Sequence, residues 1–341
     1  MIEPGVPPRL RCLLIAPQSF YSFHTTVARG LEARGYDVEM LNEEFPENAV
    51  GKILGKLALP VLRRLTLAGL RQRLDGRDSY DLVLIIKGRG LGPAALAYLK
   101  TRARRIVGYN FDSFGFNPSP LDWHALTDRY ATFDIHDAAE RSLPLVHLFS
   151  AAQGKPEPER RYDLSIVQRV HSDRLAYADL LLRALPPQTR TFVFLYESSK
   201  LTFLLGVLRH PVLYLRLWRH ISFAPLLYAQ AMTAMAQSRV TFDYAHPKQS
   251  GITVRCFEAI SLGVAVLTNN QAALDAGLFA DGALAHLPKD AAPADVAALV
   301  AGLARQTPQP WRRSLDDFLD DLLATGTAVP YGATSHAGVL E

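Results

Sequence analysis

The sequence has few cysteines, no long apolar run and only a small excess of positive charge. Cys12 and Cys256 are the only cysteines among 341 residues, which excludes a disulfide framework and a cysteine-based zinc site. No segment reaches the roughly 18 apolar residues of a membrane-spanning helix, and the apolar run near the N-terminus is shorter than the core of a signal peptide. The formal net charge of +4 is too small to predict a nucleic-acid partner. We therefore expect a soluble, cytoplasmic protein.

Segments typical of strands alternate with segments typical of helices. Residues 25–41 have the pattern of a helix followed by a strand, and nearly continuous apolar strands are predicted at 9–17, 80–88, 104–113 and 129–137. Such strands are expected where helices cover both faces of a parallel sheet. We therefore expect an α/β fold.

A proline- and charge-rich stretch interrupts this alternation before the pattern starts again. Together with a usual domain size of roughly 100–200 residues, the interruption predicts two domains. We place an N-terminal domain at 1–150, a linker at 151–162 and a C-terminal domain at 163–325. Residues 326–341 lack periodicity and are predicted to be a flexible tail.

The densest group of polar residues follows a strand that ends at Asp243. A loop leads into an amphipathic helix, so that Gly251 and Thr253 fall at the helix N-terminus, where free backbone N–H groups favour an anion. Arg255 is placed to bind the same phosphate, and Glu258 to accept hydrogen bonds from ribose hydroxyls. The group predicts a nucleotide diphosphate site at the carboxyl edge of the sheet. The alternative is a capped surface helix with an incidental arginine and glutamate.

Three segments resemble a known family: "HPKQSGITVRCFEAISLG" (246–263), "YNFDS" (109–113) and "FDIHDAAERSLPLVHLF" (133–149). The first is similar to the donor-site motif of GT-B glycosyltransferases. Together they resemble a bacterial family of capsule, exopolysaccharide and spore-coat glycosyltransferases over roughly residues 80–290. The resemblance implies two Rossmann-like domains with parallel sheets that face a central cleft. It also implies transfer of a sugar from a nucleotide-sugar donor to a glycan or lipid-linked acceptor in surface polysaccharide synthesis.

The resemblance assigns the donor to the C-terminal domain and the acceptor to the N-terminal one. It implies that Arg169 neutralises the leaving diphosphate with Lys200 as a partner, although a solvated surface role is equally compatible with both. The remaining donor-site roles are the diphosphate for Gly251, Thr253 and Arg255, the ribose for Glu258, and the transferring sugar for Gln249.

The sequence departs from large retaining GT-B families at one position. Those families carry a second glutamate eight residues before the ribose-binding one, and Ser250 stands there instead. We therefore favour inverting transfer, which needs a general base for the acceptor hydroxyl. Asp112 and His24 are the candidates, because each follows a predicted strand of the N-terminal domain. The alternatives are a helix N-cap for Asp112 and a helix-start histidine for His24.

A second acidic group of the family has counterparts at Asp134, His136 and Asp137, which line the same cleft or cap the next helix. No acidic motif has a metal-binding context, so we expect no metal and no cofactor besides the nucleotide-sugar substrate. Two other functions share the nucleotide pocket. One is a GT-B-fold sugar-nucleotide epimerase, and the other is a non-catalytic nucleotide-sugar-binding subunit of a polysaccharide assembly complex.

Two stretches, 50–74 and 200–228, combine aliphatic and basic residues. In the first, apolar residues from Val50 to Leu65 keep helical spacing. One interpretation is a pair of core-packed helices with solvated basic faces. The other is peripheral association with an anionic inner membrane.

Overall fold

The computed structural model describes residues 9–18, 23–152, 156–157 and 159–325, which form two compact units. The described residues up to His147 form the first unit together with those from Leu315 onward. Leu148–Ser314 form the second unit. Among the described residues, no helix combines the length and the apolar character needed to cross a bilayer.

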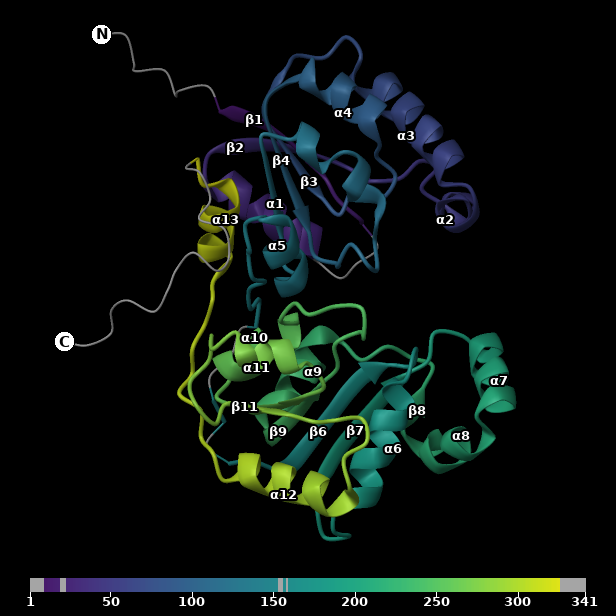
Figure 1. The fold of residues 1–341 in the computed structure, drawn as a ribbon, viewed down its shortest axis with the longest axis vertical. Coiled ribbons are helices and arrows are strands. Elements are labelled where there is room, and N and C mark those ends of the chain that lie inside the picture. The colour runs from purple at the N-terminus through teal and green to yellow at the C-terminus, as the bar shows by residue number, and fades with distance from the viewer. Residues whose placement is uncertain (1–8, 19–22, 153–155, 158, 326–341) are drawn as a thin grey trace, which may run out of the picture. The chain divides into compact units, whose positions relative to one another are not determined.

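The first unit is built on a five-stranded parallel sheet (Figure 1). Its strands are β1 (Leu10–Ile15), β2 (Tyr36–Leu41), β3 (Tyr80–Ile86), β4 (Ala103–Asn110) and β5 (Arg129–Thr132), in the spatial order β2-β1-β3-β4-β5. The helices are α1 (Phe23–Ala33), α2 (Ala49–Leu57), α3 (Leu59–Leu74), α4 (Pro93–Lys100) and α5 (Ile135–Arg141), with short 3-10 turns at Ser119–Asp122 and His124–Leu126. Because the order reverses between β1 and β3, the switch point of the sheet lies there.

Helices cover both faces of this sheet. Leu13 and Ile15 of β1 and Val83 of β3 pack in one core with Leu70 of α3 and Leu96 of α4. Figure 1 shows α1 on the opposite face. A strand buried on both faces needs apolar residues at every position, which explains the continuous apolar run of β3.

The second unit has a six-stranded parallel sheet in the order β11-β10-β9-β6-β7-β8. Its strands are β6 (Tyr162–Arg169), β7 (Thr191–Tyr196), β8 (Ile221–Ser222), β9 (Ser238–Asp243), β10 (Ala265–Thr268) and β11 (Leu284–His286). Its helices are α6 (Arg174–Ala184), α7 (Lys200–Arg209), α8 (Pro211–Leu217), the 3-10 turn η3 (Trp218–His220), α9 (Tyr228–Ala236), α10 (Val254–Ser261), α11 (Gln271–Asp275) and α12 (Pro293–Ala304). The strand order reverses between β6 and β9, which places the second switch point there.

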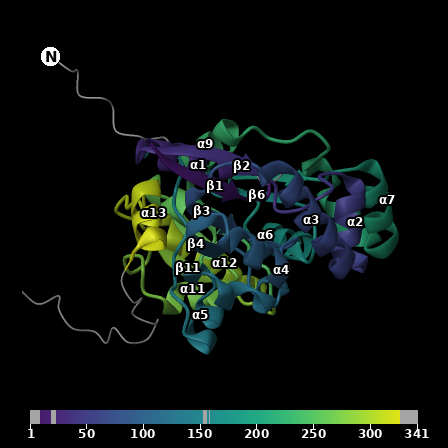
Figure 2. The same ribbon diagram turned by 90° about the horizontal axis from the view of Figure 1, so that it is seen from above.

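The C-terminal helix α13 (Leu315–Leu323) belongs to the first unit, whereas the sequence placed residues up to 325 in the second domain. Its buried face includes Phe318, whose ring lies 5.1 Å from that of Tyr109 on β4. Arg34, which directly follows α1, pairs with Asp316 and Asp320 at 2.5 and 2.8 Å. Both views show α13 beside α1 (Figure 1, Figure 2). Local apolar spacing predicts the helix but not the unit against which it packs.

The interpretation in which the apolar stripe between Val50 and Leu65 packs in the core is wrong. Leu54 is half-buried and the other stripe residues, Val50, Ile53, Leu57, Val61 and Leu65, are exposed. The buried residues of α3 are instead Leu62, Thr66, Leu70 and Leu74. The helix is also broken at Ala58, where α2 ends and α3 begins. The break changes the face that α3 turns to the sheet, so a spacing counted across it gives the wrong residues. The predicted tail, 326–341, lies outside the described residues.

We predict that Phe318→Ala destabilises the first unit by roughly 3–5 kcal/mol, because it removes a fully buried ring. Hydrogen exchange followed by mass spectrometry should show faster exchange in α1 and β4 and unchanged exchange in β6 to β11. Faster exchange confined to the second unit would contradict the assignment of α13.

Candidate functional site

The predicted donor-site residues lie at the switch point of the second sheet. β6 ends at Arg169 and β9 ends at Asp243, and these two strands are neighbours on either side of the reversal. Open parallel sheets bind ligands in the crevice outside the carboxyl ends of such strands. The loop after Asp243 leads into α10, so the predicted site occupies this place.

The carboxylate of Asp243 holds the start of α10 against the sheet. It is buried and accepts hydrogen bonds from the hydroxyls of Thr253 at 2.5 Å and Thr268 at 2.9 Å, and from the thiol of Cys256 at 3.5 Å. Thr253 is the N-cap residue of α10. Since its hydroxyl is engaged within the protein, its backbone N–H is the group that remains for an anion.

Two asparagines after β10 fix the loop that precedes α10. The side-chain amide of Asn270 donates to the carbonyls of Ser250 at 3.1 Å and Gly251 at 3.0 Å. Asn269 exchanges two hydrogen bonds with the backbone of Ala245, at 2.7 and 2.9 Å. Sequence reasoning missed both residues, although a pair of asparagines directly after a strand is a visible signal.

Glu258 is buried on the inner face of α10, with 4% of its surface exposed. Its carboxylate accepts a hydrogen bond of 2.8 Å from the hydroxyl of Tyr228. Burial raises its pKa, while Arg255 and the Tyr228 hydroxyl act in the opposite direction. A sheltered carboxylate that holds one hydroxyl donor is suited to bind another hydroxyl, such as that of a ribose.

Arg255 connects α10 to the other strand at the switch point. Its Nη2 donates to the carbonyl of Val167 on β6 at 3.3 Å. Its Nη1 is buried and has no hydrogen-bond partner within the part of the chain that the structure describes. A buried donor without an acceptor is unusual in proteins, and an anion in the crevice would supply the acceptor.

A cluster of basic side chains lies near the end of β6. Desolvation by its neighbours and the charges of Arg174, Arg169 and His246 together lower the pKa of His171 to about 4, although its side chain is partly open to solvent. Three positive or protonatable neighbours around one neutral histidine produce a positive potential that favours an anion. Only Arg169 of this cluster was predicted. The segment "RVHSDR" directly after β6 carries the signal for the others.

The remaining predicted donor residues are less closely connected to this cluster. Lys200 is the first residue of α7 and is exposed, and no hydrogen bond or ion pair of the described residues joins it to Arg169. Gln249 lies in the loop before α10, where its backbone N–H donates to the carbonyl of His246 at 2.8 Å.

The first unit carries a second polar cluster at the carboxyl ends of its strands. Lys87 follows β3 in a left-handed conformation, with a φ of 67°. Its ammonium lies 2.7 Å from the carboxylate of Asp112, which follows β4 and is buried. No helix of the described chain begins directly after Asp112, so the alternative role as an N-cap does not apply.

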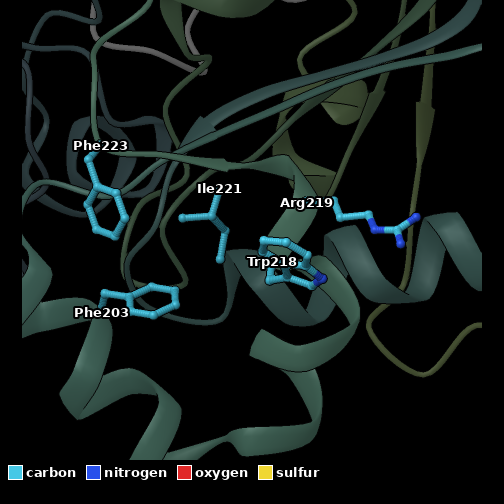
Figure 3. A pocket seen from close by; sticks show the side chains of 5 residues that line it. All are labelled: Phe203, Trp218, Arg219, Ile221 and Phe223. Atoms are coloured by element: carbon cyan, nitrogen blue, oxygen red, sulfur yellow. The ribbon is translucent and has the colours of Figure 1, made fainter.

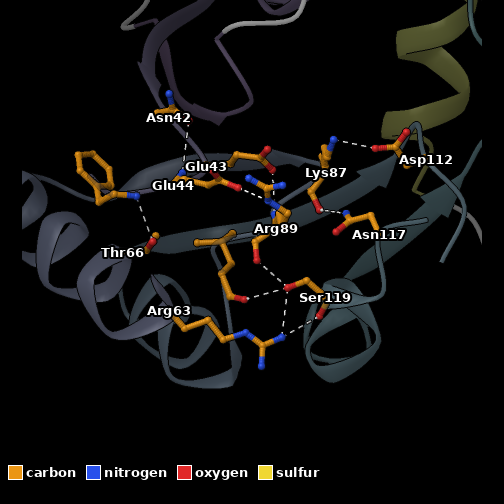
Figure 4. Close-up of polar contacts among 12 residues, drawn as sticks. Asn42, Glu43, Glu44, Arg63, Thr66, Lys87, Arg89, Asp112, Asn117 and Ser119 are labelled. Atoms are coloured by element: carbon orange, nitrogen blue, oxygen red, sulfur yellow. Dashed lines mark hydrogen bonds and ion pairs between the residues drawn. The ribbon is translucent and has the colours of Figure 1, made fainter. Parts of the chain in front are cut away.

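Glu43 lies beside this ion pair and was missed by sequence reasoning (Figure 4). It follows β2, is buried, and its Oε2 accepts a hydrogen bond of 2.8 Å from the backbone N–H of Arg89. The neighbouring Glu44 pairs with the Arg89 guanidinium. Burial raises the pKa of Glu43 to about 7, although Lys87 opposes this shift. The sequence signal that could have indicated this site is the pair of consecutive glutamates, Glu43 and Glu44, after β2.

His24 is the second residue of α1 and is half-buried. Its Nδ1 has no hydrogen-bond partner among the described residues. The preceding Phe23 packs edge-on against Phe111, with ring centroids 5.6 Å apart. Because Phe111 precedes Asp112, the start of α1 lies beside the end of β4, and the two predicted base candidates belong to one region of the first unit.

The second acidic group has structural roles. Asp134 caps α5 by accepting the backbone N–H of Asp137 at 3.1 Å. Asp137 accepts the backbone N–H of Phe114 at 2.6 Å. His136 is exposed. The helix-capping alternative therefore describes Asp134, whereas Asp137 holds the loop at Phe114.

No protein-family model and no curated protein matches the sequence, but solved structures share its architecture. Anabaena HepE, solved with UDP and glucose, is 13% identical with a TM-score of 0.57 over 88% of this chain and 91% of its own. Sucrose-phosphate synthase from Thermosynechococcus elongatus is 12% identical with a TM-score of 0.55, over 95% and 96%. UDP-GlcNAc 2-epimerase from Methanocaldococcus jannaschii, solved with UDP-GlcNAc and UDP, is 10% identical with a TM-score of 0.54, over 93% and 99%.

These similarities show that the chain has the GT-B fold, as the sequence predicted. At these identities they show the fold alone. The narrower resemblance to capsule, exopolysaccharide and spore-coat enzymes stays a prediction.

We predict that the stability of the protein depends on pH through Glu43. Its pKa of about 7 in the folded state lies above the ordinary value of 4.5. The stabilisation from its bound proton is therefore complete below about pH 4.5 and is lost as the pH rises through 7. The side chain of Glu43→Gln is neutral at every pH, so this variant does not lose that stabilisation. The free energy of unfolding of the variant minus that of the wild type should therefore be about 2 kcal/mol larger at pH 8 than at pH 5.

Urea unfolding at several pH values measures this difference. Glu47→Gln, at an exposed glutamate of the same segment, is the matched control and should follow the wild-type curve. Parallel curves for Glu43→Gln and the wild type would show that Glu43 is ionised throughout this range.

Proposed function

We propose that the protein is a glycosyltransferase that moves a sugar from a nucleotide-sugar donor to an acceptor hydroxyl. The observation that carries this proposal is the start of α10 at the second switch point. There a glycine-containing loop, Arg255 and the buried carboxylate of Glu258 follow one another within eight residues, and the buried Nη1 of Arg255 has no hydrogen-bond partner among the described residues. These are the groups that a diphosphate and a ribose require.

The second unit is proposed to bind the donor. Gly251, the N-terminus of α10 and Arg255 would hold the diphosphate, and Glu258 would exchange its contact with Tyr228 for the ribose. Arg169, with Lys200, would neutralise the leaving nucleotide, and Gln249 would contact the sugar. HepE was solved with UDP and the epimerase with UDP-GlcNAc, so uridine nucleotides are the first donors to test.

The first unit is proposed to activate the acceptor. In direct displacement, the acceptor oxygen forms a bond to the anomeric carbon as the bond from that carbon to the diphosphate oxygen breaks. The hydroxyl proton passes to a base, and the diphosphate leaves with the electron pair. A base with a pKa near the working pH is the most effective. Glu43 therefore joins Asp112 and His24 as a candidate, with Lys87 positioning both carboxylates.

Positive charge for the leaving group would come from Arg255, Arg169 and the N-terminus of α10, so we propose a reaction that needs no metal. A glycan or lipid-linked acceptor in bacterial surface polysaccharide synthesis is the proposed context, as the family resemblance implies.

An epimerase is the second candidate, because UDP-GlcNAc 2-epimerases share the fold over 93% of this chain. The two functions differ in their products. An epimerase converts the sugar while the nucleotide remains attached, whereas a transferase releases the nucleoside diphosphate.

We predict that UDP or a UDP-sugar stabilises the protein in a thermal-shift assay. A ligand at 100 times its Kd should contribute about 2.7 kcal/mol. Arg255→Ala should weaken binding by roughly 10- to 100-fold, because a charge-assisted hydrogen bond contributes about 1.5–3 kcal/mol. Arg183→Ala, at an exposed arginine of α6 in the same unit, is the control and should bind as the wild type does. If UDP shifts the melting temperature of Arg255→Ala and Arg183→Ala equally, Arg255 does not contact the nucleotide.

We also predict that Glu43→Gln and Asp112→Asn each lower kcat by at least 100-fold and leave the nucleotide Kd unchanged. The rate of nucleoside diphosphate release from the bound sugar nucleotide provides the measurement, and NMR of the sugar detects epimerisation. Asp78→Asn, at an exposed carboxylate of the first unit, should keep full activity. Binding without either product would instead identify a non-catalytic nucleotide-sugar-binding subunit.

A further inference from the structure

The segment from α7 to η3 exposes an apolar face that no described residue of its own unit covers. α7 has no buried residue, and α7, α8 and η3 follow one another at the edge of the sheet beside β8 (Figure 1). The exposed fraction reaches 72% at Leu208 and 75% at Leu215. We call this face the α7–η3 surface, and its members are Leu201, Leu204, Leu205, Leu208, Val212, Leu215 and Trp218.

The opposite side of the same segment is firmly attached to the second unit. The ring of Phe203 lies 5.2 Å from that of Tyr214 and 5.4 Å from that of Phe223. Tyr214 and Leu217 are buried. The hydroxyl of Thr202 donates to the buried carboxylate of Glu197 at 2.6 Å. The leucines are therefore held outward by a fixed scaffold.

The charged residues of the segment itself are all basic. No aspartate or glutamate occurs between Glu197 and Asp243, a stretch that contains Lys200 and four arginines. Arg216 is engaged with Asp179 at 3.2 Å. Arg209, at the junction of α7 and α8, and Arg219, in η3, are exposed. This is the pattern of an apolar face with a basic rim.

Aromatic side chains complete the rim. A hollow of about 380 Å³ is lined by Phe203, Trp218, Arg219, Ile221 and Phe223. Figure 3 shows the three aromatic rings around Ile221, with the guanidinium of Arg219 directed away from them. Aromatic rings beside arginines are typical of the boundary between headgroups and acyl chains.

The α2 helix offers a useful contrast. It also exposes apolar residues, including Val50 and Leu57. The segment 49–74 likewise contains basic but no acidic residues, so charge alone does not separate the two segments. It contains no aromatic residue, however, whereas the α7–η3 segment contains Phe203, Tyr214 and Trp218. The aromatic side chains therefore favour the α7–η3 surface for the headgroup boundary of a bilayer.

We infer that the α7–η3 surface docks the protein on the headgroup region of an anionic lipid bilayer. The leucines and Trp218 enter the boundary with the acyl chains, and Arg209 and Arg219 contact the lipid phosphates. Each basic residue near the headgroups should strengthen binding about fivefold. This inference does not depend on the proposed glycosyl transfer, because the exposed leucines, Trp218, Arg209 and Arg219 have no role in the proposed donor and acceptor sites.

Vesicle flotation tests it with the full-length protein. Vesicles of phosphatidylcholine alone are compared with vesicles that contain 30% phosphatidylglycerol, at 0.15 and 0.5 M NaCl. We expect binding to the anionic vesicles, at least tenfold weaker at the higher salt concentration because the charges are screened. Leu208→Ser with Leu215→Ser, and separately Arg209→Gln with Arg219→Gln, should each lower the partition coefficient at least tenfold.

The matched control is Val50→Ser with Leu57→Ser on α2, which should keep wild-type binding. The melting temperature and the UDP-induced shift of every variant show whether it is folded. Absence of binding to anionic vesicles, or an equal loss in the α2 variant, overturns the inference. So does a concentration-dependent dimer in light scattering that Leu208→Ser with Leu215→Ser abolishes, because the surface would then be covered by a second copy of the chain.

Discussion

The hydrogen bonds of Asp243 are the constraint on which the candidate donor site depends. A buried carboxylate must find donors, because leaving it unpaired costs several kcal/mol. Thr253, Cys256 and Thr268 supply them from the start of α10 and from β10. These bonds fix α10 against the end of β9, and the orientations of Arg255 and Glu258 follow from its position. Asp243 thus contributes to the candidate donor site indirectly, because it holds the backbone of α10 in place.

The polar cluster of the first unit contains two carboxyl groups beside one lysine. Glu43 and Asp112 lie near one ammonium group, that of Lys87, in a region where water is largely excluded. Lys87 pairs directly with Asp112, and burial favours the protonated form of Glu43. Two carboxyl groups with a shared cation and different surroundings are a common arrangement for moving a proton. The second unit has the reverse arrangement, in which cations surround the neutral His171.

Much of the fold follows from the sequence, because continuous apolar strands such as β3 are typical of a parallel sheet covered on both faces. The α10 motif could also be located, since its loop, arginine and glutamate are close in sequence. Glu43, Lys87 and Asn270 could not be ranked, because their roles arise from neighbours on other strands. The failed apolar stripe of α2 and α3 has a similar cause: a break at Ala58 leaves the spacing unchanged but alters which face is buried.

The position of α13 makes the second unit an insertion in the first. The chain passes from the first unit to the second after His147 and returns at Leu315. During synthesis, residues 148–314 are complete before α13 leaves the ribosome, so the second unit can reach its native packing first. Until α13 has been synthesised, the faces of α1 and β4 against which it packs stay exposed to solvent. The second unit can therefore complete its fold before the first, although the chain begins with the first.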